Sequence, residues 1–280
     1  MLKVAIPNKG SLSESAIAML KEAGYRQRTD PRDLVLIDPQ NEIEFYYLRP
    51  RDIALYVASG ELEVGITGRD LLIDSAAQAV EVLALDFGKS TFRFAATSGT
   101  SVREADLAGK RIASAYPGLV RNYLESKGIA AVVVQLDGAV ESSIRLGVAD
   151  VIADVVSTGG TLRQAGLVTF GDPILQSEAI VIARSGAQSD AIETLIRRLQ
   201  GVVIAKQYVL VDYDVADALL EAACALTPGI ESPTVSSLQK NGWSAVRAMV
   251  KKSDINRIMD DLWKVGARGI LVTDIHACRL

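Results

Sequence analysis

One short segment combines a carboxylate with a turn rich in glycine and hydroxyl groups. Asp154 follows an apolar run, and Ser157, Thr158, Gly159, Gly160 and Thr161 come shortly after it. Two adjacent glycines permit positive φ, so successive backbone N–H groups can point into one concavity, to which the hydroxyls add donors. At the start of a helix, such a turn forms an anion pocket suited to a phosphate. Because a carboxylate beside it can accept hydrogen bonds from both hydroxyls of a ribose, the segment predicts a phosphoribosyl site. An ordinary strand-to-helix turn is the alternative.

The sequence contains a single histidine, which limits the other chemistry that the chain can perform. His276 lies close to the end of the 280 residues. Catalysis by Ser-His-Asp or Cys-His groups and zinc sites with several histidines are therefore not expected. We expect chemistry that depends on charge and on positioning of substrates rather than on imidazole.

Charge and hydropathy patterns exclude two classes of partner. The 30 basic and 34 acidic residues are mixed along the chain, with no basic block that could neutralise a nucleic-acid backbone. No window reaches the roughly 18 apolar residues of a membrane span, and no signal-peptide core follows the N-terminus. We therefore expect a cytoplasmic protein that binds neither nucleic acid nor membrane.

Two parts of the chain repeat one order of elements. A strand over 3–6, a loop over 7–10 and a helix from residue 11 or 13 to 24 are matched by 111–115, 116–118 and 119–127. A helix over 53–60, a strand over 63–66 and a loop over 67–70 are matched by 143–147, 150–153 and a loop that begins at 154. A further strand is expected over 177–183 and a helix over 191–199. This alternation predicts two α/β lobes with parallel sheets and a ligand cleft at the carboxyl ends of their strands.

The remainder of the chain has a different pattern. Strands are expected over 207–211, 232–237, 243–250 and 269–273, with helices over 215–225 and from Ser253 or Asp254 to 265. The apolar positions of the second helix recur at helical spacing, and either residue can cap it. The order βαββαβ predicts a ferredoxin-like domain.

Five motifs in order resemble those of one family. The segment around Asp154 resembles the loop of phosphoribosyltransferases, although the common fold usually carries two adjacent acids where this chain has Ala153-Asp154. Together with residues 4–10, 48–53, 65–71 and 136–141, it makes the whole chain similar to the ATP phosphoribosyltransferase family. The C-terminal part is similar to the regulatory domain of the long form of that enzyme.

The resemblance implies an activity and an architecture. The activity is the first step of histidine biosynthesis, in which adenine N1 of ATP attacks the anomeric carbon of phosphoribosyl diphosphate and diphosphate leaves, with Mg²⁺ and feedback inhibition by histidine. The architecture is α/β, with two periplasmic-binding-protein-like lobes and a ferredoxin-like regulatory domain, in a homo-oligomer from dimer to hexamer. The expected boundaries are 1–92 with 178–205 for the first lobe, 93–177 for the second lobe with the phosphoribosyl diphosphate loop, and 206–280 for the regulatory domain.

The predicted site residues form three groups. Phosphoribosyl diphosphate is assigned to Asp154, Ser157, Thr158, Gly159, Gly160 and Thr161, and ATP and its phosphates to Lys9, Arg49, Asp70, Tyr116, Asp137 and Glu141. The resemblance alone implies that histidine binds near Asp214, Ile230, Ser232, Thr234 and Gly269. No residue is assigned as a general acid or base, and none as a metal ligand, because Mg²⁺ is often held largely by substrate phosphates.

Less specific roles stay open for these residues. Lys9 and Arg49 could be surface charges, Asp70 could bridge to Arg69, and Tyr116 could pack at a hinge. Asp137 and Glu141 flank a helix start, where acids commonly cap. For the whole chain, a two-lobed sensor that binds a small molecule without catalysis and a nucleobase phosphoribosyltransferase are the alternatives.

Overall fold

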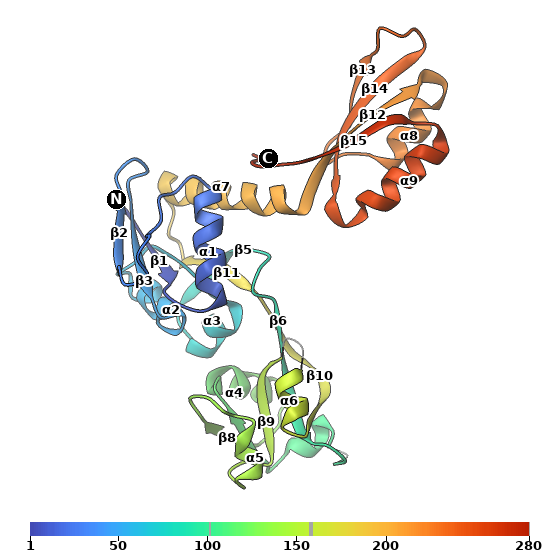
Figure 1. Ribbon diagram of the computed structural model, residues 1–280. Helices are drawn as coiled ribbons and strands as arrows, with labels where there is room; N and C mark the ends of the chain where they lie inside the picture. Colours follow the sequence, from blue (N-terminus) through green and yellow to red (C-terminus); the bar gives the residue numbers. More distant parts are fainter. Residues whose placement is uncertain (101, 157–158, 280) are drawn as a thin grey trace. The chain divides into compact units, whose positions relative to one another are not determined.

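The computed structural model describes residues 1–100, 102–156 and 159–279. The chain divides into two compact units, the first formed by Met1–Lys21 and Tyr25–Ile196 and the second by Glu22–Gly24 and Arg197–Leu280. Figure 1 labels their elements. The helix α7 (Asp190–Gln207) spans the boundary between the units and is longer than the helix expected over 191–199.

A six-stranded sheet and three helices make up what we call the first lobe. The strand order is β2 (Val35–Asp38), β3 (Ile43–Leu48), β1 (Leu2–Pro7), β4 (Val64–Gly68), β11 (Ala179–Arg184) and β5 (Ala79–Ala84). The helices are α1 (Ser11–Glu22), α2 (Pro50–Ser59) and α3 (Arg69–Ser75). The α2 helix buries Ile53, Ala54 and Val57 against the sheet. This packing needs Gly65, because a β carbon there would lie 2.5 Å from Ile53 Cγ2.

A five-stranded sheet forms the second lobe of the same unit. The order is β10 (Leu167–Ser177), β6 (Ser90–Thr97), β9 (Val151–Val156), β7 (Arg111–Ser114) and β8 (Val132–Gln135). The helical elements are η1 (Glu104–Leu107), α4 (Pro117–Ser126), α5 (Ser142–Arg145) and α6 (Gly160–Gln164). Buried clusters that include Phe92 and Ile152 lie on opposite faces of this sheet. The chain passes between the two sheets twice, from β5 to β6 and from β10 to β11, which fits the predicted periplasmic-binding-protein-like lobes.

Long-range strand pairing changes several of the predicted elements. Both sheets are mixed rather than parallel, because β11 runs antiparallel between β4 and β5 while β6 runs antiparallel to β9 and β10. Pairing with β11 extends β4 to Gly68, so the expected loop over 67–70 is wrong and Arg69 begins α3. Pairing with β6 extends β9 to Val156 and places Asp154 inside a strand. The strand expected over 177–183 is interrupted at Glu178, where the chain changes sheets.

The second unit contains a four-stranded antiparallel sheet with two helices. Its elements are β12 (Tyr208–Ala216), α8 (Leu220–Leu226), β13 (Thr234–Ser237), β14 (Trp243–Lys251), α9 (Ile255–Val265) and β15 (Arg268–Asp274), with two short helices, η2 (Asp217–Leu219) and η3 (Lys252–Asp254). The order β13-β14-β12-β15 confirms the ferredoxin-like fold. The helix expected over 215–225 starts later, because β12 pairs with β14 as far as Ala216. Asp254 precedes α9 without a capping hydrogen bond from its side chain, so the expected cap is wrong.

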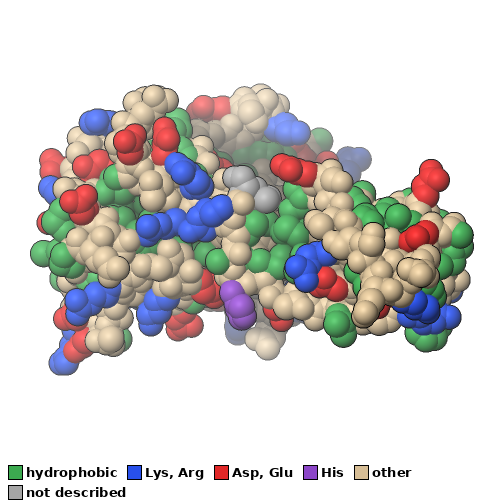
Figure 2. Space-filling model, turned by 90° about the horizontal axis from the view of Figure 1, so that it is seen from above, with side chains coloured by type: hydrophobic (Ala, Val, Ile, Leu, Met, Phe, Trp, Pro, Cys, Tyr) green, Lys and Arg blue, Asp and Glu red, His purple; other side chains and the backbone are tan. Residues whose placement is uncertain are grey.

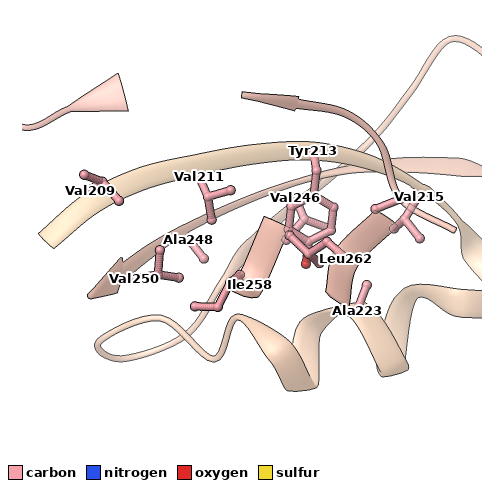
Figure 3. Packing of buried hydrophobic residues seen from close by; sticks show 11 residues of the cluster. Val209, Val211, Tyr213, Val215, Ala223, Val246, Ala248, Val250, Ile258 and Leu262 are labelled. Atoms are coloured by element: carbon pink, nitrogen blue, oxygen red, sulfur yellow. The ribbon is translucent and has the colours of Figure 1, made fainter. Parts of the chain in front are cut away.

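The core of the second unit lies between its sheet and its helices. Alternate residues of β12 point toward α8 and α9, and Figure 3 shows Val211 and Tyr213 among Val246, Ile258 and Leu262. Within the described part of this unit, α8 and α9 both pack on this face of the sheet. The Tyr213 hydroxyl is buried and forms a hydrogen bond with Thr227 Oγ1 at 2.7 Å, which satisfies a polar group that would otherwise be costly to bury.

The surface agrees with the mixed charge of the sequence. On the face shown in Figure 2, acidic and basic side chains are interspersed. His276 is exposed and lies in the second unit. In the described part of the chain, no helix has the length and apolar character that a bilayer span requires.

Candidate active site

Three predicted residues, Asp70, Tyr116 and Asp154, come together in the first unit, and we call them the three-residue cluster. Tyr116 precedes α4, and its ring packs edge-on against Phe92 with centroids 5.3 Å apart. Burial raises the pKa of the Tyr116 hydroxyl, and the nearby negative charges of Asp70 and Asp154 raise it further. The structure therefore gathers one aspartate from each lobe around a tyrosine, as expected for residues at the carboxyl ends of strands.

Asp154 is a largely buried carboxylate on β9. Its Oδ1 accepts the N–H of Val155 at 2.7 Å, and it takes part in none of the ion pairs found among the described residues. Burial raises the pKa of Asp154, and the negative charge of Glu141 contributes in the same direction. A buried carboxylate without a cationic partner has unused capacity to accept hydrogen bonds, such as those from ribose hydroxyls.

The glycine turn after β9 is partly as predicted. Gly159 has φ +69° and precedes α6, whereas Gly160 is the first residue of that helix and does not use the positive φ that a glycine permits. Thr161 is exposed in the first turn. Ser157 and Thr158, also predicted here, lie outside the described residues. Because α6 is only five residues long, the donors available to an anion are its first N–H groups rather than a long helix dipole.

Asp70 is fixed by a hydrogen bond to the strand that leaves the second lobe. Its Oδ1 accepts the Ser177 hydroxyl at 2.9 Å, and the Asp70 N–H donates to the same Ser177 Oγ at 3.0 Å. Arg69 does not bridge to Asp70. Instead, its guanidinium donates two hydrogen bonds of 2.8 Å to Glu81 and lies 3.3 Å from Glu178, which raises the pKa of Arg69.

Lys9 and Arg49 lie at the same edge of the first sheet. They follow β1 and β3, which pair in parallel with Pro7 opposite Leu48, and the Asn8 N–H donates to the Leu48 carbonyl at 2.8 Å. Both basic side chains are exposed. Lys9 borders a cavity of about 400 Å³ that also reaches the first turn of α1.

A buried arginine that the sequence analysis did not select supports this edge. Arg28 lines the same cavity and is 6% exposed. Its guanidinium donates to the carbonyl oxygens of Asn8 at 2.8 Å, Pro31 at 2.8 Å and Asp33 at 2.7 Å, and it lies 4.0 Å from the centroid of the Tyr47 ring. Arg28 therefore holds the loop that carries Lys9. Its polar surroundings in the sequence resemble a surface loop and gave no signal of this role.

Asp137 and Glu141 lie near the end of β8. Asp137 is exposed, and Glu141 precedes α5 without a capping hydrogen bond from its side chain. The capping role considered for Glu141 is thus not observed. Its charge acts on Asp154 instead, which places Glu141 within electrostatic reach of the three-residue cluster.

A contact between the lobes was also missed. Asp74 on α3 accepts the N–H groups of Gly118 at 2.8 Å and Leu119 at 3.2 Å, which belong to the first turn of α4. Arg51 on α2 donates to Asp74 at 2.8 Å and to the Ala115 carbonyl at 3.0 Å, and its guanidinium lies 5.0 Å from the Tyr116 ring centroid. The N-terminus of α4 is therefore capped by a protein carboxylate.

The predicted effector residues lie in the second unit. Gly269 has φ +59°, and a β carbon there would lie 3.4 Å from Asp214 Oδ2, so Asp214 and Gly269 are neighbours. Thr234 begins β13, and strand pairing places it two strands away on the same face as Asp214, the face opposite α8 and α9. Ile230 and Ser232 lie in the loop before β13. The structure brings two of the five residues together directly.

No group of three or more His, Cys, Asp or Glu side chains arranged to hold a metal ion occurs among residues 1–100, 102–156 and 159–279. The cluster itself contains the carboxylates of Asp70 and Asp154, and the charge of Glu141 acts on Asp154. Such a set could supply one or two ligands to a cation whose remaining ligands come from substrate phosphates and water.

Comparison with known proteins gives consistent matches along the chain. The family model described as "ATP phosphoribosyltransferase" matches residues 49–201, and that described as "HisG, C-terminal domain" matches residues 205–277. The chain is 62% identical to the ATP phosphoribosyltransferase of Arthrobacter sp. (strain FB24) and 61% identical to that of Salinispora tropica, over 100% of each chain. It is also similar to a chain of the solved "ATP phosphoribosyl transferase (HisG:HisZ) complex from Thermotoga maritima", with 26% identity and a TM-score of 0.63 over 74% of this chain and 99% of that chain.

Proposed function

The chain belongs to the ATP phosphoribosyltransferase family, and we propose that ATP meets phosphoribosyl diphosphate at the cluster of Asp70, Tyr116 and Asp154. The activity is transfer of the phosphoribosyl group to ATP with release of diphosphate, the first step of histidine biosynthesis. The observation that supports this location is the partly buried Asp154 carboxylate, which has no cationic partner among the described residues and stands before a glycine turn.

The reaction needs positioning and charge stabilisation more than proton transfer. Adenine N1 forms a bond to the anomeric carbon as the bond from that carbon to the diphosphate oxygen breaks. The lone pair of N1 is available without a base, which agrees with a site built from aspartates and a tyrosine. Positive charge develops on the ribose, and the Asp154 carboxylate stabilises it while accepting hydrogen bonds from the ribose hydroxyls.

The two substrates are assigned to different lobes. In this proposal the turn from Ser157 to Thr161 holds the 5′-phosphate of the ribose, through backbone N–H groups and hydroxyls. Lys9 and Arg49 bind phosphates of ATP at the edge of the first sheet, where the 400 Å³ cavity offers room and Arg28 holds the loop in place. Tyr116 stacks on the adenine, and Asp70, Asp137 and Glu141 border the bound nucleotide.

Mg²⁺ is the cation proposed for this site. When bound, it neutralises charge on the leaving diphosphate. The carboxylates of Asp70, Asp154 and Glu141 fit a cation that is held largely by substrate phosphates. No residue is therefore assigned as a direct ligand of the cation.

We also propose that the second unit binds histidine and inhibits catalysis. Asp214 is a reasonable partner for the ammonium or imidazolium of histidine, and Gly269 leaves space beside that carboxylate. Ser232 and Thr234 offer hydroxyls, and Ile230 offers an apolar contact. The division at 92, 177 and 205, the homo-oligomer from dimer to hexamer and the cytoplasmic location remain predictions from the sequence and the family resemblance.

Release of diphosphate is the decisive measurement for this proposal. Enzyme, phosphoribosyl diphosphate and Mg²⁺ should release diphosphate promptly only after ATP is added, and histidine should slow the release. Turnover with orotate or a free purine base, but none with ATP, would indicate a nucleobase phosphoribosyltransferase. Tight binding of phosphoribosyl diphosphate without product after long incubation with ATP would indicate a sensor without catalysis.

A further inference from the structure

Ser177 lies where the chain passes from the sheet of the second lobe to that of the first. It is the last residue of β10, and β11 begins two residues later in the other sheet. Its side chain is buried, and its hydroxyl accepts the Asp70 N–H at 3.0 Å and donates to Asp70 Oδ1 at 2.9 Å. The single hydroxyl proton is thus committed to the Asp70 carboxylate.

The start of α3 depends on this crossover for its hydrogen bonds. The first N–H groups of a helix have no acceptor within the helix, and Gly68, which precedes α3, has no side chain that could cap them. The Arg69 N–H donates to the Glu178 carbonyl at 3.0 Å, and the Asp70 N–H donates to the Ser177 hydroxyl. A β carbon at Gly68 would clash with Asp70 Oδ1. The glycine therefore leaves room for the carboxylate at the helix start.

The strands that carry Ser177 also support Tyr116. In the antiparallel pair of β6 and β10, Ser90 lies opposite Ser177, and Phe92 follows two residues after Ser90. The Phe92 ring packs edge-on against the Tyr116 ring. One pair of strands therefore contacts both Asp70, through the Ser177 hydroxyl, and Tyr116, through the Phe92 ring.

We propose that Ser177 is a positioning residue for the reaction, because its hydroxyl holds the Asp70 carboxylate in the orientation in which it borders Tyr116 and the bound nucleotide. The inference rests on the proposed function, which places ATP beside these two residues. Both hydrogen bonds of the Ser177 hydroxyl are used within the protein, so Ser177 acts through Asp70 rather than on the substrate. The ion pairs found among the described residues do not include Asp70. Without the hydroxyl, no cation would keep the carboxylate in place.

Steady-state kinetics of Ser177→Ala test this role. A displacement of about 1 Å near the reacting groups can cost about 100-fold in rate, and loss of one contact should produce part of that effect. We expect kcat/KM for ATP to fall about 5- to 30-fold, while the KM for phosphoribosyl diphosphate stays within about twofold of the wild-type value. Ser177→Thr retains a hydroxyl and should recover kcat/KM to within about threefold of the wild type.

Ser244→Ala is the matched control. The Ser244 hydroxyl donates to Asp217 Oδ1 at 2.8 Å, so the change removes a similar hydrogen bond from serine to aspartate in the second unit. It should lower the Tm to a similar degree and leave kcat/KM unchanged. If Ser177→Ala also keeps wild-type kcat/KM while its Tm falls, Ser177 is only structural and the proposal is overturned. A rise in KM confined to phosphoribosyl diphosphate would overturn it as well.

A double-mutant cycle with Asp70→Ala shows whether Ser177 acts through Asp70. In the Asp70→Ala background, Ser177→Ala should change kcat/KM for ATP by less than about twofold, because the group that Ser177 positions is gone. Effects that multiply in the double variant would overturn the proposal.

Calorimetric titration of the full chain with ATP repeats this cycle without turnover. The ATP affinity should fall in Ser177→Ala and should fall no further when Ser177→Ala is added to Asp70→Ala. An inactive wild type that showed this pattern would contradict only the proposed function. An inactive wild type whose ATP affinity did not respond to Ser177→Ala would contradict both proposals, and an active wild type matched by Ser177→Ala in rate and affinity would contradict only the positioning role.

Discussion

Replacing Asp74 by alanine should impair catalysis through the contact between α3 and α4. The Asp74 side chain is 7% exposed and accepts three hydrogen bonds, two from the first turn of α4 and one from Arg51. Asp70 lies one turn earlier on α3, and Tyr116 directly precedes α4. The helices joined by Asp74 are thus the helices that bring Asp70 and Tyr116 together.

The expected loss of stability follows from these contacts. Removing a helix cap costs about 0.5–2 kcal/mol. The ion pair with Arg51 adds only about 0.2–1 kcal/mol, because the Arg51 side chain is 50% exposed. The free energy of unfolding should therefore fall by about 1–3 kcal/mol, which corresponds to a decrease in Tm of roughly 3–10 °C for a domain of this size. Asp74→Asn retains a neutral acceptor and should lose about half as much.

The effect on catalysis should be larger than the effect on folding. A displacement of about 1 Å between reacting groups can cost about 100-fold in rate, so Asp74→Ala should lower kcat/KM about 10- to 100-fold at a temperature where the variant is fully folded. Asp150→Ala is the matched control. It removes an ion pair of 2.8 Å with Arg111 and an acceptor for the Arg111 N–H, at the amino end of β9 and away from the cluster.

Diphosphate release and thermal denaturation are measured on Asp74→Ala and on Asp150→Ala, to separate an effect on catalysis from an effect on stability. Asp150→Ala should lose stability to a similar degree and keep wild-type kcat/KM. If Asp74→Ala also keeps wild-type kcat/KM while its Tm falls, the contact stabilises the unit without positioning the site, and the reasoning is refuted. If neither the Tm nor the rate changes, the cap itself contributes nothing measurable.

Three further substitutions test charge at defined positions. Asp154→Asn should lower kcat/KM about 10- to 100-fold, as the ribose hydroxyls lose a charged acceptor. The pKa of Asp154 is raised in the folded state, so the ionised carboxylate destabilises the fold once the pH rises above the unfolded pKa of about 3.8. The Asp154→Asn variant should therefore have a higher Tm than the wild type at pH 7.5 but not at pH 3. Asp150→Asn should show the opposite trend, since Arg111 lowers the pKa of Asp150 to about 2; its deficit in Tm at pH 6 should shrink as pH falls from 4 toward 2. Asp214→Asn should raise the histidine concentration for half-inhibition about tenfold or more, and an unchanged value would remove Asp214 from the effector site.

Local patterns were sufficient to predict the residues of the cluster. The glycine turn and its preceding carboxylate are contiguous in the sequence, so Asp154 and Gly159 could be assigned before the sheet was known. The βαββαβ order followed from hydrophobic periodicity, which depends on neighbouring residues. Asp70 and Tyr116 were found because each follows a strand whose carboxyl end must face the cleft.

The missed features depend on partners far along the chain. The antiparallel β11 lies between β4 and β5 only because the chain returns from the second lobe, and this return extends β4 and places Arg69 on a helix. Asp74 caps a helix that begins 43 residues later, at Pro117. The role of Arg28 depends on its hydrogen bond to the Asn8 carbonyl, 20 residues earlier in the chain. No periodicity or spacing reports such contacts.

The contact between Asp74 and the first turn of α4 shows why the two repeated strand-loop-helix units are not equivalent. In the first lobe, the turn from β1 into α1 borders an open cavity with Lys9 at its rim. In the second, Asp74 occupies the N–H groups of α4, and Gly118 is required because a β carbon there would clash with the Asp74 carbonyl oxygen. A phosphate at the second position would face a carboxylate at close range, which is electrostatically unfavourable. This difference supports the proposal that an anion in the second lobe binds at the turn after Asp154, and that ATP phosphates bind at the edge of the first lobe.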